Sequence, residues 1–543
     1  FYRGTEDLDL ECQVRASLLR AANTEKAIAD FAQTWTIGSV LPSSCDPVIS
    51  YWQQQNLLTP ELVWQRIRIA TRATNSRLVN ELVKLLPATS KPAALLYPRV
   101  HANPGLISDE NLFSVGDSKY REIALYGLQR LAYRDLTAAL SLWNVLEQRF
   151  QFSPSERAQT QILMGILLAQ DQREEALPWL MNVNADQETP RVREWRVRSA
   201  IFNQNWTLAL ASIGWLDEKQ QAETRWRYWY ARALEKTGSK EDALAIYAQI
   251  ATLRDYHGFL AADRISRPYS FQNKPIEFTP DQLETIEHIP GLLRARELYA
   301  MNRVVDARRE WEFTRQFLND QILIGVAKLA QKWGWHSLAI ATAAQSGYYD
   351  DVSMRFPLRY QDIVQTRAEH LKIEPHWIYG ILRQESAFAE DARSSKGALG
   401  LMQLMPQTGR HIAKRSGAPM RHAHELLRAE RNIELGSSYL HEIRARLFDH
   451  PVLATAAYNA GPQRVLRWLP KTENVEADIW IETIPYDETR DYLERVLAFT
   501  LIYDWRLDEE TTALMSFMRP ISPLQETKTV VNEPQSDDAP KDG

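Results

Sequence analysis

Residues 377–406 read WIYGILRQESAFAEDARSSKGALGLMQLMP, and they carry the clearest structural signal in the chain. Pro375 stands just before this stretch, at a position where the first turn of a helix tolerates a missing N–H. Glu385 follows Ile378 by seven residues and Ile381 by four, so helical geometry places all three on one face. The spacing therefore predicts a helix whose apolar face ends in a single carboxylate.

The surroundings of Glu385 make it a candidate general acid. Apolar neighbours, including Phe388, desolvate a carboxylate and raise its pKa by roughly one to two units above about 4.3. A carboxyl group that stays protonated near neutral pH can donate a proton in a reaction. For a glutamate considered alone, an ordinary residue near a helix end is the more frequent case, so the residues that follow decide the interpretation.

A glycine-rich hairpin is predicted directly after this helix. Gly397 and Gly400 allow a sharp turn and a close approach of the backbone to another group. Gln403 lies in the apolar run that follows and offers both a donor and an acceptor. Such an amide suits a sugar hydroxyl or an N-acetyl group.

The segment resembles the first two motifs of the soluble lytic transglycosylases, a family with a goose-type lysozyme-like catalytic domain. Two later segments follow in the family's order, one at the end of a small-residue helix over 452–460 and one leading into a helix that contains Tyr492. The matching residues are Glu385-Ser386, Ser394, Gly397-Ala398-x-Gly400-Leu401-Met402-Gln403-x-Met405-Pro406, Ala457-Tyr458-Asn459-Ala460-Gly461 and Ile484-Pro485-Tyr486-Asp487-Glu488-Thr489-Arg490.

The resemblance implies that the protein is a peptidoglycan lytic transglycosylase. In that chemistry Glu385 protonates the β-1,4 glycosidic oxygen between N-acetylmuramic acid and N-acetylglucosamine, and the 2-acetamido group stabilises the charge at C1. Glu385 then takes the proton of the C6 hydroxyl, which attacks C1 to give a 1,6-anhydromuramoyl product. Glycosidic cleavage usually requires a pair of carboxylates, and substrate assistance is an exception to this rule. A single acid such as Glu385 agrees with substrate assistance. The residues that the resemblance assigns to substrate binding are Ser394, Gln403, Met405, Tyr458, Asn459, Glu488 and Tyr492.

The residues alone leave two other functions possible. A muramidase or chitin hydrolase would use Glu385 as the acid and would need a second carboxylate opposite it. Glu390 and Asp391 are the nearest in sequence, and we expect both to be solvated in the polar turn, away from the face of Glu385. The third possibility is a non-catalytic periplasmic scaffold that only grips glycan strands.

Composition favours a helical protein that acts on neither nucleic acid nor membranes. The 543 residues contain 21 glycines and 17 tryptophans, which favours helices with aromatic packing. With 64 basic and 69 acidic residues, the net charge of −5 gives no support to binding of nucleic acid or anionic lipid. No apolar run is long enough for a transmembrane helix. The resemblance implies no metal or cofactor. His424-Glu425 and His441-Glu442 lack the second histidine of a zinc-protease motif, so we expect no metal site there.

An alanine-centred pattern recurs between Ala139 and Ala339, with no equally clean repeat before about residue 120. The first four alanines are 37, 33 and 34 residues apart, and periods near 34 are typical of tetratricopeptide-like helical hairpins that stack into a solenoid. An irregular helical bundle is the alternative. The alanines are Ala139, Ala176, Ala209, Ala243, Ala307 and Ala339.

These observations predict an all-α protein with three domains and a tail. In the family, a U-shaped superhelical domain and a linker domain form a ring around the catalytic domain; here the first domain is shorter than usual, which leaves ring closure open. The predicted ranges are 1–274 for the superhelical domain, 275–349 for the helical linker domain, 350–519 for the lysozyme-like catalytic domain and 520–543 for a disordered tail.

The resemblance also implies a compartment. The chain begins at Phe1 with no visible signal peptide, so we expect a periplasmic protein whose signal has been removed. We expect a monomer that acts on peptidoglycan strands, with other cell-wall enzymes as candidate partners of the helical domain. Cys12 and Cys45 are the only cysteines, which fits either a reduced compartment or one disulfide, and a periplasmic setting favours the disulfide.

Overall fold

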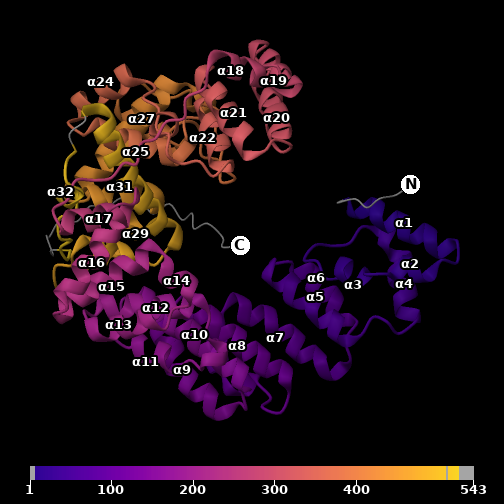
Figure 1. The fold of residues 1–543 in the computed structure, drawn as a ribbon. Helices are drawn as coiled ribbons and strands as arrows, with labels where there is room; N and C mark the ends of the chain where they lie inside the picture. The colour runs from indigo at the N-terminus through magenta and orange to yellow at the C-terminus, as the bar shows by residue number, and fades with distance from the viewer. Residues whose placement is uncertain (1–6, 509–510, 525–543) are drawn as a thin grey trace. The chain divides into compact units, whose positions relative to one another are not determined.

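The structure, a computed structural model, describes residues 7–508 and 511–524, which fold into helices joined by turns (Figure 1). The described residues contain isolated β-bridges but no sheet, and the predicted all-α class is confirmed. The chain divides into two compact units, Phe1–Trp195 and Arg196–Gly543. The boundary between them falls inside helix α12 (Pro190–Phe202), within the range predicted as one superhelical domain.

Helices of the first unit pack in consecutive pairs, such as α5 on α6 and α8 on α9. Polar side chains cap several of them: Asp135 accepts the Ala138 N–H at the start of α9, and Ser153 and Glu156 form a capping box at α10. The helices are α1 (Leu8–Arg20), α2 (Thr24–Ile28), α3 (Phe31–Trp35), α4 (Asp46–Gln54), α5 (Pro60–Arg72), α6 (Ser76–Lys84), α7 (Lys91–Ala102), α8 (Ser118–Ala132), α9 (Leu136–Arg149), α10 (Pro154–Gln170) and α11 (Ala176–Met181).

A disulfide bond joins the first helices of this unit. Cys12 of α1 bonds to Cys45, which directly precedes α4, across a sequence separation of 33 residues. Both cysteines are fully buried in the same core as Phe31 and Trp52. The disulfide therefore closes a loop around the beginning of the first unit, as the periplasmic interpretation favoured.

We expect the double variant Cys12→Ser/Cys45→Ser to lose about 3–4 kcal/mol of unfolding free energy, because the cross-link restricts the unfolded chain over this loop length. Urea unfolding of the oxidised protein and of the variant, followed by tryptophan fluorescence, measures the difference. Reductant should destabilise the unmodified protein but leave the double variant unchanged. Equal unfolding midpoints for the oxidised protein and the variant would contradict the prediction.

The second unit begins with further helix pairs, including α15 on α16, α19 on α20 and α21 on α22. All six alanines of the predicted repeat, two of which lie in the first unit, are buried. Five of them lie in the second helix of a contacting pair, whereas Ala209 lies in α13, which contacts α15. The repeat interpretation is thus confirmed. The helices are α13 (Trp206–Gly214), α14 (Glu218–Ala222), α15 (Thr224–Thr237), α16 (Lys240–Ile250), α17 (Tyr256–Arg264), α18 (Pro280–Glu287), α19 (Pro290–Ala300), α20 (Val304–Arg315), α21 (Asp320–Lys332), α22 (His336–Gln345) and α23 (Val352–Arg355).

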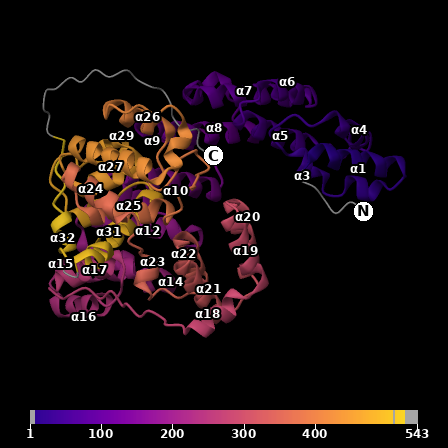
Figure 2. The same cartoon turned by 90° about the horizontal axis from the view of Figure 1, so that it is seen from above.

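The last helices of the second unit gather around a contact between α25 and α31, which lie side by side in both views (Figures 1 and 2). Gly380 permits this approach, because a Cβ there would lie 2.6 Å from the Thr500 hydroxyl of α31. The helices are α24 (Gln361–Leu371), α25 (Pro375–Ser386), α26 (Pro406–Arg415), α27 (Ala429–Arg446), α28 (Pro451–Ala460), α29 (Pro462–Arg467), α30 (Ala477–Glu482), α31 (Asp487–Asp508) and α32 (Leu514–Phe517).

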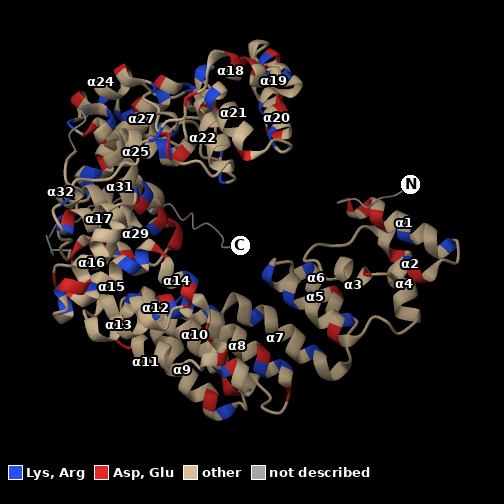
Figure 3. Cartoon of the chain, in the orientation of Figure 1, with Lys and Arg blue, Asp and Glu red and all other residues tan. Residues whose placement is uncertain are grey.

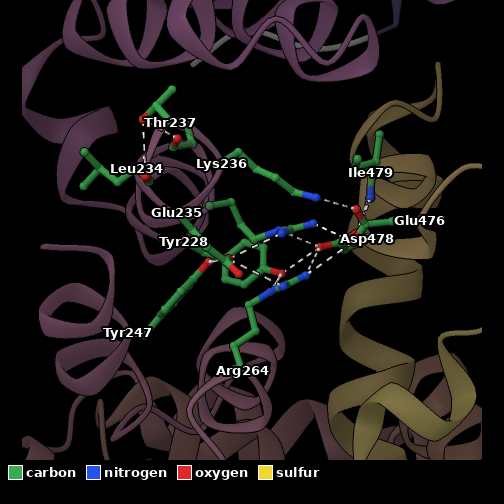
Figure 4. Close-up of polar contacts among 12 residues, drawn as sticks. Tyr228, Leu234, Glu235, Lys236, Thr237, Tyr247, Arg264, Glu476, Asp478 and Ile479 are labelled. Atoms are coloured by element: carbon green, nitrogen blue, oxygen red, sulfur yellow. Dashed lines mark hydrogen bonds and ion pairs between the residues drawn. The ribbon is translucent and has the colours of Figure 1, made fainter. Parts of the chain in front are cut away.

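A buried polar junction joins α12, α15 and α17 to α30. The Tyr228 hydroxyl donates to Asp478 over 2.7 Å, and Arg264 forms an ion pair with the same carboxylate at 3.1 Å (Figure 4). The Arg198 guanidinium bonds to Glu482 at 2.9 Å, and both side chains are 1% exposed. Removing one partner of such a buried pair costs about 3–5 kcal/mol, so the junction fixes α30 firmly within the second unit.

The end of the described chain differs from the predicted tail. Ile521 is fully buried and forms a two-way backbone pairing with Val475, at 2.9 and 2.8 Å, so this part of the range predicted to be disordered is structured. The rest of that range, residues 525–543, lies outside the described residues. The predicted domain boundaries at 274/275 and 349/350 lie inside the second unit and stay predictions.

Charged residues of both signs are scattered over the helices of each unit (Figure 3). No helix in the described part of the chain combines the length and the apolarity needed to cross a bilayer.

Candidate active site

Glu385 lies in the last turn of α25, and Tyr492 approaches it from the first part of α31. The Tyr492 hydroxyl donates a hydrogen bond to Glu385 Oε1 over 2.7 Å. Burial raises the pKa of Glu385 to about 7, against the opposing effect of this hydrogen bond, and the nearby charge of Glu488 adds to the rise. The predicted rise in pKa is confirmed, and its main cause is the desolvation inferred from the apolar face.

Tyr458 connects Glu385 to the hairpin after α25. It lies near the end of α28, and its hydroxyl donates to the Met402 carbonyl over 2.9 Å. Burial and the neighbouring Glu385 raise the pKa of Tyr458 well above its usual value, so the phenol stays neutral and keeps its donor hydrogen. The Tyr439 ring of α27 packs 5.4 Å from the Tyr458 ring and was not singled out from the sequence, where nothing distinguishes it from other helical tyrosines.

The hairpin depends on Gly400 and on a buried asparagine. Gly400 has φ +77°, and a Cβ there would lie 2.0 Å from the Leu426 carbonyl, so only glycine fits. The Asn432 side chain accepts the Met402 N–H at 2.7 Å and donates to the Leu399 and Leu426 carbonyls at 2.9 and 2.7 Å. Asn432 was not predicted from the sequence. Its only sequence signal is an amide side chain next to apolar positions of a helix.

The polar residues of the hairpin are largely engaged within it. The Gln403 amide nitrogen donates to the Ala392 and Gly400 carbonyls at 3.1 and 2.8 Å. The Ser394 hydroxyl oxygen accepts the Ala398 N–H at 2.9 Å, and Ser394 is exposed. Both side chains therefore shape the hairpin as well as its surface.

The remaining predicted binding residues lie at its edges. Met405 directly precedes α26 and is 43% exposed. The Asn459 side chain accepts a hydrogen bond from Thr489 at 2.7 Å and thereby joins α28 to α31. Glu488 is exposed in the first turn of α31 and lies close enough to Glu385 to influence its pKa.

The carboxylates nearest to Glu385 in sequence are engaged elsewhere. Glu390 is exposed, accepts a hydrogen bond from the Tyr360 hydroxyl and lies 3.6 Å from the Arg359 guanidinium. Asp391 pairs with Arg308 at 2.8 Å. These contacts place neither Glu390 nor Asp391 as a partner of Glu385.

One group in the described residues has the ligand atoms of a metal site. His257, Glu482 and Glu494 bring one such atom each to within 4.8 Å of one another. Burial would raise the pKa of Glu482, but Arg225 and Arg198 outweigh it and lower the pKa to about 2. Arg225 also pairs with Glu494 at 2.8 Å, so arginines already neutralise both carboxylates and the group does not suit a cation.

Three segments of the chain match known protein families. Residues 362–481 match the Transglycosylase SLT domain, and residues 285–352 match the Soluble lytic murein transglycosylase L domain. Residues 483–511, which include all of α31, match the Soluble lytic transglycosylase helical domain.

The fold is shared with solved structures over nearly the whole chain. Lytic transglycosylase Slt from Pseudomonas aeruginosa, solved as an inactive mutant with glutamine in place of one glutamate, is 35% identical with a TM-score of 0.84. The match covers 93% of this chain and 82% of that one. The chain belongs to the soluble lytic transglycosylase family.

Relatives from Escherichia coli agree with this assignment. The Soluble lytic murein transglycosylase of strain K12 is 27% identical over 510 residues, covering 93% of this chain and 79% of the relative. The crystal structure of the 70-kDa soluble lytic transglycosylase from the same species is 26% identical with a TM-score of 0.78, covering 95% of this chain and 83% of that one.

The hydrogen bond from Tyr492 allows a prediction on pH dependence. It stabilises the ionised form of Glu385, so Tyr492→Phe raises the pKa of Glu385 above about 7. Because a general acid fails as the pH rises through its pKa, the alkaline limb of the rate profile should move upward by up to about one pH unit. Turnover should fall roughly tenfold through loss of positioning.

The profile of kcat/KM for peptidoglycan breakdown between pH 5 and 9 measures this shift. Tyr486→Phe is the matched control, because Tyr486 is 46% exposed and lies outside the contact with Glu385. An alkaline limb that stays in place or moves downward in Tyr492→Phe would contradict the assignment.

Proposed function

We propose that this protein is a peptidoglycan lytic transglycosylase in which Glu385 acts first as the acid and then as the base. The observation that carries the proposal is the half-buried carboxyl group of Glu385, with a pKa of about 7 and a single phenolic donor, Tyr492. Near neutral pH such a group is partly protonated, and its conjugate base is strong enough to recover a proton. The relatives' names support the substrate, and the inactive glutamine mutant of the relative supports dependence on one glutamate.

In the first step Glu385 gives its proton to the oxygen that joins C1 of N-acetylmuramic acid to N-acetylglucosamine. The C1–O bond breaks, the leaving sugar keeps the proton and the bonding electrons, and the 2-acetamido oxygen stabilises C1. In the second step the C6 hydroxyl of the same muramic acid attacks C1, and its proton returns to Glu385. The product is a 1,6-anhydro sugar, and no water is consumed.

The neighbours of Glu385 receive roles that follow from their contacts. We propose that Tyr492 and Tyr458 orient the carboxyl group and the glycan, since Tyr492 is buried against Glu385 and the partly buried Tyr458 lies close enough for the two charges to interact. Ser394, Gln403 and Met405 line the saccharide subsites along the hairpin. Asn459 and Glu488 lie beside the bound strand at the start of α31.

We further propose a periplasmic monomer with the domain ranges 1–274, 275–349 and 350–519. The disulfide Cys12–Cys45 supports an oxidising compartment, and peptidoglycan as substrate supports the periplasm. Other cell-wall enzymes are the partners that we propose for the helical domains.

Mass spectrometry of the soluble products released from purified peptidoglycan tests the function. We expect anhydromuropeptides, which are lighter by one water than hydrolysis products. Glu385→Gln should fold and release none, because an amide cannot donate or recover the proton. Glu390→Gln, a matched change five residues along, should retain activity, since the Glu390 side chain bonds elsewhere. Reducing-end products, or turnover by Glu385→Gln, would overturn the mechanism.

A second variant tests whether one carboxylate is enough. Glu488 is exposed and acts on Glu385 only through space, so Glu488→Gln should change turnover by less than about tenfold. Removing this negative charge also lowers the pKa of Glu385 slightly, which moves the alkaline limb of the rate profile downward. If Glu488 were the base of a hydrolase, the loss would reach about 10²–10⁴-fold. The same product assay separates the two outcomes.

A further inference from the structure

Three arginines of the first unit gather around one histidine. Helix α7 packs against both α5 and α8, and His101 lies in its last turn. Arg72 ends α5, Arg130 lies in the last turn of α8, and Arg134 follows that helix. Burial lowers the pKa of His101, and the charges of the three arginines lower it further, so all three lie near its ring. We call Arg72, Arg130, Arg134 and His101 the arginine cluster.

Tyr126 of α8 lies at the centre of the arginine cluster. The Arg72 guanidinium lies over its ring, 5.5 Å from the centroid. Its hydroxyl oxygen lies 2.5 Å from Nδ1 of His101 and shares a hydrogen bond with it. Arg130 follows Tyr126 by four residues, so helical geometry places both on one face of α8. These contacts bring charged groups of α5, α7 and α8 to one place.

Close packing of α7 and α8 fixes the backbone that carries these groups. Gly127 permits the close approach, because a Cβ there would lie 2.7 Å from the Val100 side chain of α7. Arg134 donates to the carbonyl of Ala102, the residue after His101, at 3.3 Å. The positive charges are therefore held together by the packing of the helices, in spite of their mutual repulsion.

The arginine cluster has no carboxylate that neutralises it. None of its three arginines forms an ion pair within residues 7–508 and 511–524, and the Arg130 Nε is buried without a hydrogen-bond partner there. Glu122 lies one helical turn before Tyr126 but already pairs with Arg68 at 3.2 Å. A buried donor without a partner costs free energy. The cluster therefore combines free positive charge with a free donor.

This arrangement differs from that of the buried arginines in the second unit. There Arg198 pairs with Glu482 at 2.9 Å, and Arg225 pairs with Glu494 at 2.8 Å, so each guanidinium has its carboxylate within the fold. Neutralisation by a carboxylate of the same chain is what a structural role predicts. The arginine cluster lacks this neutralisation, which favours a role in binding an anion.

The charge and the donors restrict the kind of anion. A guanidinium presents a planar fork of N–H groups that matches either a carboxylate or a phosphate. A single carboxylate has one negative charge and would leave most of the charge of the cluster unmatched. A phosphate monoester carries a charge of about −1.5 to −2 near pH 7 and has three strong acceptor oxygens. A phosphate group is therefore the better match for three arginines.

We propose that the arginine cluster binds a phosphate group, carried either by a free phosphate ester or by the headgroup of an anionic lipid. Arg72 and Arg134 are exposed and give the phosphate access from solvent, and the partly buried Arg130 supplies a further donor. The net charge of −5 describes the whole chain, whereas this site depends on local charge. The cluster lies in the first unit and Glu385 in the second, so the inference does not rest on the proposed function.

Thermal unfolding of the full chain in inorganic phosphate, compared with sodium chloride at the same ionic strength, tests the proposal. Phosphate should raise the melting temperature, because a ligand that binds the folded state stabilises it. Since phosphate also stabilises proteins in general, the comparison between variants decides. Arg72→Gln and Arg134→Gln should each weaken phosphate binding roughly tenfold, the loss of one charge-assisted interaction, and so reduce the rise.

Arg157→Gln is the matched control. It makes the same change in the same unit, at a side chain that is 50% exposed and pairs with Glu147 at 3.2 Å, and it should keep the full response to phosphate. Without phosphate, Arg130→Gln should melt no lower than the unmodified chain, because it removes one of three charges that repel one another. All of these variants should still release anhydro products from peptidoglycan, since they leave Glu385 and its neighbours unchanged.

Two further probes distinguish the sources of the phosphate group. Sedimentation with phosphatidylcholine vesicles only when they contain phosphatidic acid, and only with Arg72 and Arg134 intact, would assign a lipid headgroup. Binding of a soluble sugar phosphate without such sedimentation would assign a free ester. An equal response to phosphate by Arg72→Gln and Arg157→Gln would overturn the proposal. A lower melting temperature of Arg130→Gln without phosphate, or tighter binding of a glutamate-rich peptide than of any phosphate, would also overturn it.

Discussion

The ion pairs buried between α12, α15 and the α30–α31 segment are the constraint on which the active site depends. Glu482 ends α30 and is bonded by Arg198 and by the Trp229 indole, and Arg225 reaches onward to Glu494 of α31. Each charge would be strongly unfavourable without its partner. The junction therefore fixes the direction in which α31 extends from α30. Helix α31 carries Tyr492, whose hydroxyl donates to the catalytic carboxyl of Glu385.

Glu385, the catalytic residue, differs from Glu482 in which protonation state its surroundings favour. Around Glu482 the protein supplies cations, and the carboxylate stays ionised. Around Glu385 it supplies one phenol and apolar surface, and the neutral form is favoured. The two glutamates lie in the same unit and share the helix α31 as a neighbour. Their different chemistry follows from the hydrogen-bond donors and charges around them, although Glu482 is fully buried and Glu385 half-buried.

The sequence predicted the local features and missed the long-range ones. The spacing of Ile378, Ile381 and Glu385 was enough to predict the helix, the buried face and the raised pKa. The hydrogen bond from Tyr492 joins residues 107 apart, and no spacing rule predicts which tyrosine arrives there. Asn432 was missed for the same reason, because its three partners lie on other segments.

The organisation of the chain into helix pairs and units was likewise predicted only in part from the sequence. The alanine repeat predicted the helix pairs correctly, since small residues at a fixed period report close helix contact. It runs without interruption past residue 195, so it gave no sign of the boundary between the two compact units.

The junction just described also has a consequence for how such chains change by recombination. Arg198 and Arg225 pair with carboxylates 284 and 269 residues later, so each segment needs the other to neutralise its buried charges. A hybrid that exchanged only the glycan-cutting segment would bury unmatched charges.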